Sequence, residues 1–321
     1  MSPAASSSSS TRVPISTHSL NLTIHPGPPG APASTPAVLI LQGLASDSYM
    51  WSAAIRHITT ITQVYSYSRS GYGDSDPSPN PPTASTIALE LSDLLASARI
   101  TGPWILLAHS WGGIHTREFL DLRRKDVVGV VLVDANQETT IERLDWRDPC
   151  IWAVVGVEES RDRAWCERIM GIPGRHKLSD EEYALHLAAT TSAAHERQGQ
   201  AEHAEYAASF ETLQRKPHLL LSHQPPLLGD APVAVVKGDN RRDFQCLYEY
   251  GVARGHGAEH ERGVFRNYLE TWDQRDGELQ REQLKLSTRG RYVEVKGSGH
   301  DVQMTAPEAL AEAVAWVLEE L

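Results

Sequence analysis

Short apolar segments alternate with helical segments through the first 135 residues of the chain. Four of them have the length and apolar content of buried strands: 37–43, 63–68, 104–108 and 127–133. Between the second and the third, the apolar residues of 86–99 recur at helical spacing, and 111–124 can form another helix. This alternation is typical of a parallel sheet that carries helices on both faces. We therefore expect an α/β fold with a mostly parallel central sheet.

The pattern changes after this region. Residues 139–230 contain no convincing strand and consist mostly of helical segments, with tryptophans at Trp146, Trp152 and Trp165. We expect a helical cap over 139–230, inserted into a core formed by 13–138 and 231–321. The aromatic residues of the cap predict a largely apolar pocket wall, which favours a small or medium organic substrate. Residues 1–12 include five consecutive serines, and we expect them to form a disordered tail.

The composition narrows the class of protein. A net charge of -11 disfavours nucleic acid and anionic membrane surfaces as partners, because both attract Lys and Arg. No stretch approaches the ~20 apolar residues of a membrane span, and the N-terminus lacks the apolar region of a secretory signal. The three cysteines have no spacing typical of disulfides or of a cysteine metal site. We expect a cytoplasmic protein, and the sequence leaves a homodimer open.

The segment Ile105-Leu-Leu-Ala-His-Ser-Trp-Gly-Gly113 contains the candidate nucleophile, Ser110. It approximates Gly-x-Ser-x-Gly, with Ala108 in place of the first glycine. Such a serine lies in a sharp turn between a strand and a helix, where only small neighbouring residues fit. The turn exposes the hydroxyl at a helix N-terminus, where developing negative charge is stabilised. The predicted strand before Ser110 and helix after it supply this context.

A serine nucleophile needs a base, and His300 is the best placed of the 14 histidines. It lies in Lys296-Gly-Ser-Gly-His-Asp301, between the last predicted strand, 291–296, and the last predicted helix, 309–321. Loops at the carboxyl edge of a parallel sheet face one another. We therefore expect His300 to lie near Ser110.

Together with the loop Gly71-Tyr-Gly-Asp-Ser-Asp76, these two segments resemble the α/β-hydrolase superfamily. The similarity covers residues 38–321 and is to the serine-nucleophile branch, which includes esterases and thioesterases. It implies an α/β-hydrolase fold with a cap, and the chain order nucleophile, acid, histidine. It also implies an oxyanion hole formed by the backbone N–H groups of Leu44 and Trp111, and neither a metal nor an organic cofactor. Many relatives carry His-Gly where this chain has Gln42-Gly43.

Two aspartates compete for the role of the acid that orients His300. Asp134 ends the predicted strand 127–133, and Asp239 follows the predicted strand 231–237. The later strand is the commoner location in the superfamily, although its acid usually lies a few residues beyond the glycine. Some branches carry the acid after the earlier strand, and the segment Val131-Leu-Val-Asp-Ala-Asn-Gln-Glu138 is similar to one of them. We favour Asp134, with Asp239 as the alternative.

The predicted function is that of a serine hydrolase cleaving a carboxylic ester or thioester through an acyl-enzyme. Two alternatives stay open: the same serine used for C–C bond cleavage, lyase or cyclase chemistry, and a non-catalytic small-molecule receptor. The segment His256-Gly-Ala-Glu-His260 matches a zinc-peptidase pattern. That pattern needs both histidines on one stable helix, which Gly255 and Gly257 disfavour, so we expect no metal there.

Overall fold

The computed structural model describes residues 8–32, 34–156 and 163–321. Eight strands form one sheet in the order β1-β2-β4-β3-β5-β6-β7-β8. Their bounds are β1 (Ser9–Pro14), β2 (Ser19–His25), β3 (Ala37–Leu41), β4 (Val64–Ser68), β5 (Trp104–His109), β6 (Val127–Val133), β7 (Val233–Lys237) and β8 (Gly290–Glu294). The pairs β1–β2 and β2–β4 are antiparallel, whereas β4, β3, β5, β6, β7 and β8 run parallel. The expected α/β fold with a mostly parallel sheet is confirmed.

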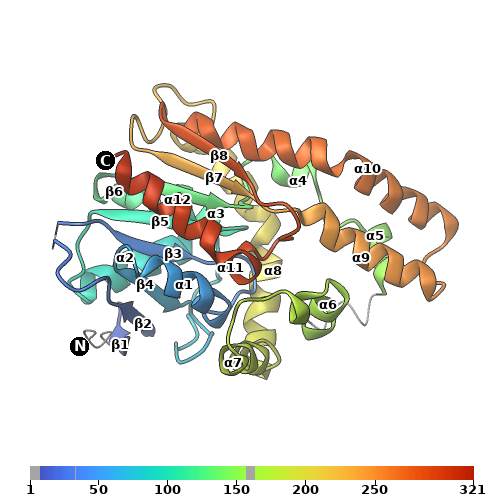
Figure 1. Ribbon diagram of the computed structural model, residues 1–321, viewed down its shortest axis with the longest axis horizontal. Coiled ribbons are helices and arrows are strands. Elements are labelled where there is room, and N and C mark those ends of the chain that lie inside the picture. The colour runs from blue at the N-terminus through green and yellow to red at the C-terminus, as the bar shows by residue number, and fades with distance from the viewer. Residues whose placement is uncertain (1–7, 33, 157–162) are drawn as a thin grey trace.

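α-Helices flank this sheet and extend beyond it (Figure 1). Their bounds are α1 (Ser52–Ile58), α2 (Ala84–Ser97), α3 (Gly112–Arg123), α4 (Thr140–Arg143), α5 (Pro149–Val155), α6 (Arg163–Ile169), α7 (Asp180–Thr190), α8 (Ala193–Gln214), α9 (Asn240–Ala253), α10 (Glu259–Glu282), α11 (Val302–Thr305) and α12 (Pro307–Glu319). Short 3-10 segments are η1 (Tyr49–Trp51), η2 (Arg124–Asp126), η4 (Ile172–Gly174), η5 (Pro217–Leu219) and η6 (Gln283–Leu286).

The core has two layers, one on each face of the sheet. Leu91 and Leu94 of α2 and Phe119 of α3 pack on one face, against alternate residues of the strands. Ile58 of α1 and Val314 of α12 pack on the other face. The central strands β3, β5 and β7 are buried at every position, as expected where helices cover both faces. Their carboxyl ends therefore meet at one edge of a rigid scaffold.

The predicted disordered tail is wrong for Ser9–Arg12, which lie in β1. This strand pairs with β2 from Ser9 opposite Ile24 to Pro14 opposite Ser19. The pairing gives hydrogen-bond partners to the backbone N–H and C=O groups of both strands. Val13 is the one buried residue of β1, so the sequence has no apolar pattern that predicts this strand. Of the rest of the predicted tail, Ser8 is described just before β1, and residues 1–7 lie outside the described residues.

Helices α4–α8 lie between β6 and β7, in the region assigned to the cap. Two helices that follow the predicted cap limit at residue 230, α9 and α10, also pack against α5. Leu247 of α9 and Phe265 and Trp272 of α10 share an apolar cluster with Val154 of α5, apart from the two layers on the sheet. Figure 1 shows α5, α9 and α10 side by side beyond the end of the sheet. Amphipathic spacing predicts these helices but does not say which neighbour their apolar faces cover.

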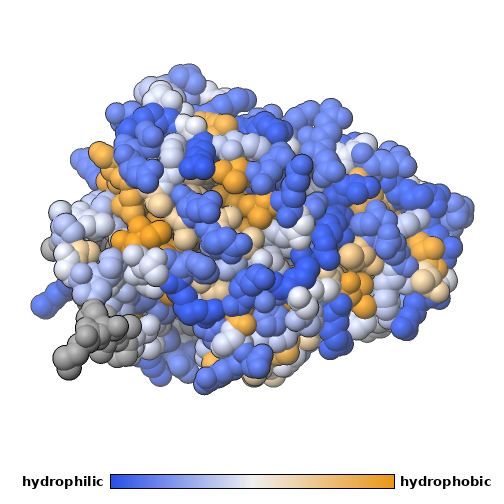
Figure 2. Space-filling model, in the orientation of Figure 1, coloured by the Kyte–Doolittle hydropathy of each residue, from blue (hydrophilic) through white to orange (hydrophobic). Residues whose placement is uncertain are grey.

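The face of the molecule in Figure 2 is mostly hydrophilic, with apolar side chains gathered near α12. In the part of the chain that the structure describes, every helix is too short or too polar to span a lipid bilayer.

Candidate active site

Ser110 occupies a strained turn between β5 and α3. Its φ is 54°, in the left-handed region that non-glycine residues rarely adopt. The turn is held on both sides: the Ser110 N–H donates to the Val133 carbonyl at 3.2 Å, and the Ser110 carbonyl accepts from the Asn136 N–H at 2.8 Å. A Cβ at Gly112 would lie 2.3 Å from the Leu41 carbonyl oxygen, so no larger residue fits there. The turn thus fixes the serine between the ends of β3 and β6.

Asp134 and His300 meet at the carboxyl edge of the sheet. Asp134 follows β6, also with a left-handed φ, of 45°. Its Oδ2 lies 2.5 Å from His300 Nδ1. The same carboxylate accepts hydrogen bonds from the Gly238 N–H and the Asn240 amide, both at 3.2 Å. Since the carboxylate can only accept, the Nδ1 of His300 carries the proton in this contact.

The contact changes the pKa of both groups. Burial alone would raise the pKa of Asp134, but the hydrogen bond and charge of His300 bring it below its usual range. Burial would lower the pKa of His300, but the hydrogen bond and charge of Asp134, together with the charges of Asp301 and Asp243, raise it above 6.5. The His300 side chain is 31% exposed, whereas Asp134 is 2% exposed. The pair is therefore a buried carboxylate that orients an accessible imidazole.

Asp239, the alternative acid, has a different contact. Its carboxylate accepts a hydrogen bond from the Gly297 N–H at 3.1 Å and so holds the start of the loop that carries His300. Asp243 accepts from the His300 N–H at 2.8 Å, and burial raises the pKa of Asp243 to about 6. Asp243 is not one of the two candidate acids that the sequence offers. The only sequence signal for it is its position in the first turn of the helix that follows β7.

His109 is a second residue that sequence reasoning missed. It is the last residue of β5, and its Nε2 lies 3.0 Å from the His300 carbonyl oxygen, with the two rings 4.4 Å apart. Burial, and next the proximity of His300, lower the pKa of His109 to about 3, so its ring is neutral. A carbonyl only accepts, so Nε2 carries the ring proton. The residue beside Ser110 thus binds the backbone of His300 and joins the two loops.

The predicted oxyanion-hole residues belong to two different segments: Trp111 follows Ser110 directly, and Leu44 follows Gly43. Trp111 is fully buried, and its indole N–H donates to Ser209 of α8 at 2.9 Å. Leu44 is partly buried in the loop after β3. A Cβ built at Gly43 would lie 3.0 Å from Ser110 Cβ, so this loop packs directly against the serine.

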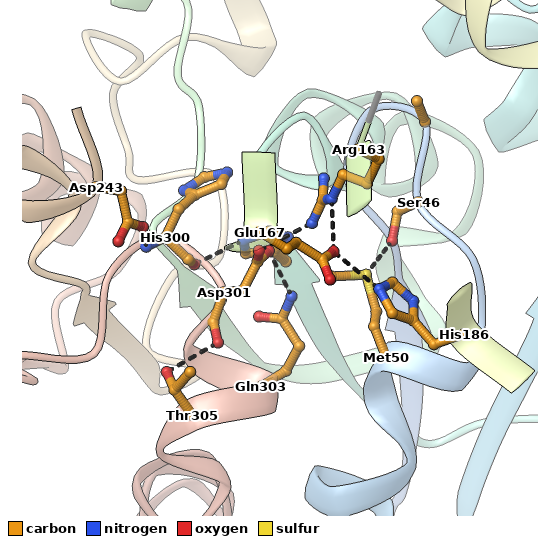
Figure 3. Close-up of polar contacts among 12 residues, drawn as sticks. Ser46, Met50, Arg163, Glu167, His186, Asp243, His300, Asp301, Gln303 and Thr305 are labelled. Carbon is orange, nitrogen blue, oxygen red and sulfur yellow. Dashed lines mark hydrogen bonds and ion pairs between the residues drawn. The ribbon is translucent and has the colours of Figure 1, made fainter. Parts of the chain in front are cut away.

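A row of charged side chains on α6 and α7 connects the His300 loop to the loop after β3 (Figure 3). Asp301 pairs with Arg163 of α6 at 2.8 Å, and Arg163 pairs with Glu167 at 2.9 Å. His186 of α7 lies between two carboxylates, 2.8 Å from Glu167 and 2.7 Å from Asp47. Both ring nitrogens of His186 face acceptors, so the ring must be an imidazolium. Despite burial, the hydrogen bonds and charges of Asp47 and Glu167 raise the pKa of His186 to about 9.

Two hollows in the surface lie away from the nucleophile. The larger, of about 330 Å³, is lined by Lys237, Gly238, Asp239, Asp273, Glu294, Val295 and Lys296. The smaller, of about 120 Å³, is lined by residues of α2 and α8. Neither includes Ser110 or His300, and the predicted apolar pocket beside the serine stays a prediction.

The segment His256–His260, which matches a zinc-peptidase pattern, does not form the continuous helix that this pattern requires. His256 lies before α10, whereas His260 lies in its first turn. Within residues 8–32, 34–156 and 163–321, no three His, Cys, Asp or Glu side chains are grouped as metal ligands.

Comparison with known proteins places the chain in a recognised family. Residues 38–313 match the alpha/beta hydrolase family. An "AB hydrolase superfamily protein" of Gibberella zeae is 29% identical over 302 residues, which cover 91% of this chain and 89% of that protein. A "probable transporter efuK" of Hormonema carpetanum is also 29% identical, over 96% of this chain, but the chain spans only 42% of that protein.

A solved structure has the same fold. The thermophilic esterase from Thermogutta terrifontis superposes with a TM-score of 0.58 at 17% identity, over 97% of this chain and 99% of the esterase. At this identity the similarity establishes the fold and no more.

Proposed function

The chain belongs to the alpha/beta hydrolase family, and from this premise we propose that it is a serine hydrolase acting on a carboxylic ester or thioester. The observation that carries the proposal is the 2.5 Å contact between His300 Nδ1 and Asp134. An imidazole whose Nδ1 proton is held by a buried carboxylate has Nε2 available as a base. Ser110 follows His109, which contacts the backbone of His300, so nucleophile and base belong to one group of loops.

In the proposed reaction, Ser110 Oγ attacks the substrate carbonyl carbon while His300 Nε2 takes the hydroxyl proton. The tetrahedral intermediate then collapses, the C–O or C–S bond breaks, and His300 returns the proton to the leaving alcohol or thiol. Water repeats the sequence on the acyl-enzyme: His300 accepts its proton, and the acid and free Ser110 are released. Asp134 stays ionised throughout and stabilises the imidazolium.

The negative charge of the intermediate needs hydrogen-bond donors. We assign them to the backbone N–H groups of Leu44 and Trp111. The position of Gly43 against the Ser110 side chain supports this assignment, because Leu44 follows Gly43 in the chain. The aromatic residues on the helices between β6 and β7 favour a small or medium organic acyl substrate.

Covalent labelling tests the proposal most directly. The protein is treated with a fluorophosphonate probe, and intact mass and peptide mapping then locate the adduct. We expect one adduct on Ser110, and none on the Ser110→Ala variant. Ser97, an exposed serine at the end of α2, provides the matched control: Ser97→Ala should label like the wild type.

Substrate panels then separate the reaction types. Release of acid from p-nitrophenyl esters or acyl thioesters by the untreated protein, and its loss in Ser110→Ala, supports hydrolysis. A folded protein that binds ligands stoichiometrically but neither labels nor turns over would overturn the proposal in favour of a receptor. Labelling without ester or thioester turnover would direct attention to C–C bond cleavage.

A further inference from the structure

A buried ion pair lies behind the loop that follows β3. The Arg69 and Glu202 side chains are 2% and 0% exposed, and their nearest atoms are 2.8 Å apart. Arg69 follows β4, whereas Glu202 belongs to α8, so the pair joins the sheet to a helix inserted after β6. Buried ion pairs seldom add stability over apolar residues, which raises the question of what this one holds.

Arg69 binds the backbone of the loop as well as Glu202. Its NH2 group donates to the Gly43 carbonyl at 2.8 Å, and its NH1 group donates to the Gln42 carbonyl at 3.2 Å. The Gly43 carbonyl belongs to the same peptide unit as the Leu44 N–H. A trans peptide is planar, so its N–H points away from its carbonyl oxygen. Fixing the Gly43 oxygen on Arg69 therefore fixes the direction of the Leu44 N–H.

The other side of Leu44 is fixed by α8. Glu202 Oε2 accepts from the Ala45 N–H at 2.9 Å, and His195 of the same helix lies 3.1 Å from the Ala45 carbonyl oxygen. Ala45 has a φ of 46°, a conformation that an alanine rarely adopts without such support. The two peptides that flank Leu44 are thus held by one ion pair.

We propose that Arg69 is a positioning residue for the oxyanion hole, and that Glu202 makes the position of the Leu44 N–H depend on the docked α8 helix. The inference rests on the proposed function, because it takes Leu44 as an oxyanion donor. The cationic guanidinium also polarises the Gly43–Leu44 amide, which strengthens the N–H as a donor. The oxyanion hole is then complete only when α8 covers this loop.

The test compares two buried arginines. Arg117 is 1% exposed, lies 3.7 Å from Glu138 and donates to a backbone carbonyl, that of Leu219, but does not contact the loop after β3. Arg69→Met should lower kcat by about 10²-fold with KM changed by less than about threefold, because the lost interaction forms only in the transition state. Arg117→Met should leave kcat within about threefold of the wild type at a similar loss of stability.

Two further readouts separate positioning from a structural role. The acid limb of the kcat/KM profile should not move in Arg69→Met, because His300 keeps Asp134. A boronic acid inhibitor, which forms a tetrahedral adduct at serine, should bind more weakly by about the same factor as the loss in kcat/KM. Arg69→Lys keeps the charge beside Glu202 and serves if the methionine variant does not fold. One ammonium cannot reproduce the guanidinium fork, so kcat should fall in this variant as well.

Hydrogen exchange of residues 42–47 gives a result that does not depend on turnover. We expect faster exchange of this segment in folded Arg69→Met than in the wild type and Arg117→Met. Unchanged exchange, unchanged kcat, or an equal loss of kcat in both arginine variants would overturn the positioning role. A wild type that neither labels nor hydrolyses esters would instead overturn the proposed function, and the exchange data would still report on the loop.

Discussion

His300 is bound through three different atoms, one in the imidazole and two in the backbone. Asp134 holds Nδ1, Asp243 holds the backbone N–H, and His109 holds the carbonyl oxygen. An imidazole fixed in this way loses little orientational freedom when it takes a proton from Ser110, which is the condition for efficient general-base catalysis. Because these aspartates bind different atoms of the His300 segment, their substitution should affect kcat/KM and its pH profile differently.

Asp134→Asn should lower kcat/KM by about 10⁴-fold, because an amide at this position stabilises the wrong tautomer and no longer balances the imidazolium. The pH profile supplies a second measurement. His300 must be neutral to act as a base, and its folded pKa is raised above 6.5. Activity of the wild type should therefore fall as the pH drops through a midpoint above 6.5, and the residual activity of Asp134→Asn should have a lower midpoint.

Asp239→Asn is the matched control for this prediction. Its carboxylate binds the Gly297 N–H and not the imidazole, so the acid limb should stay in place and kcat/KM should change much less. If Asp239→Asn instead showed the larger loss and the shifted midpoint, the acid would have to be reassigned to the later strand.

The sequence predicts the neighbourhood of the site better than its contacts. Ser110 and His300 could be singled out because a strand, a tight turn and a helix surround one, and a glycine-rich loop after the last strand surrounds the other. Asp134 and Asp239 both follow strands, so spacing could not separate them. Their difference lies in the left-handed φ of Asp134, which turns its side chain toward His300 and has no sequence signature for aspartate. The catalytic roles of these residues stay predictions until they are tested.

Among the helices, α6 and α7 connect the loops of the core. Figure 3 shows Arg163 and Glu167 of α6 and His186 of α7 following Asp301. His186 also pairs with Asp47, so positive and negative side chains alternate from Asp301 to Asp47. Amphipathic spacing predicts such helices, but their buried faces are polar here, and charge pairs between distant segments leave no periodic pattern. The predicted cap over 139–230 stays a prediction.

The charge of His186 predicts a pH dependence of folding. Its folded pKa is about 9, against 6.5 for an ordinary histidine, so its contribution to the free energy of unfolding is complete below pH 6.5 and is lost as the pH rises through 9. The shift corresponds to about 3 kcal/mol. Urea unfolding between pH 6 and 10 should show this decline in the wild type and a flatter profile in His186→Gln.

His176 offers the control for that experiment. It stacks on Tyr183 of the same region, with ring centroids 4.1 Å apart, and its ring is not placed between two carboxylates. His176→Gln should keep the alkaline decline of the wild type. If the alkaline loss of stability persisted in His186→Gln, other groups would cause it, and His186 would not carry the positive charge between Glu167 and Asp47.

The molecule as a whole places its chemistry on one edge of a sheet whose two faces are tightly covered. The proposed catalytic groups follow β5, β6 and β8, and the loop after β3 completes the group, so their relative positions depend on the packing of helices against strands. The packed interior keeps the ends of the strands in place because it resists small displacements. The layers should therefore tolerate a local loss of stability without losing the geometry of the site.

Gly129 of β6 provides a test of this separation between stability and activity. A Cβ at this position would lie 2.4 Å from Val317 Cγ1 of α12, on the face of the sheet away from α2 and α3. Gly129→Ala should lower the free energy of unfolding by about 1–3 kcal/mol, because α12 must shift outward. The double variant Gly129→Ala with Val317→Ala should recover part of this loss, because the smaller side chain makes room for the new methyl group.

A double-mutant cycle compares the wild type, Gly129→Ala, Val317→Ala and the double variant. Urea denaturation gives the free energy of unfolding of each, and kcat is measured below the unfolding transition. We expect kcat to stay within about twofold in all of them, since Ser110, Asp134 and His300 lie at the other end of the strands from Gly129 and are held by loop contacts of their own. Additive losses in the double variant would contradict the predicted contact between β6 and α12. A fall in kcat parallel to the fall in stability would show instead that the layers and the catalytic edge move as one body, so that the packing of α12 contributes directly to the alignment of the loops.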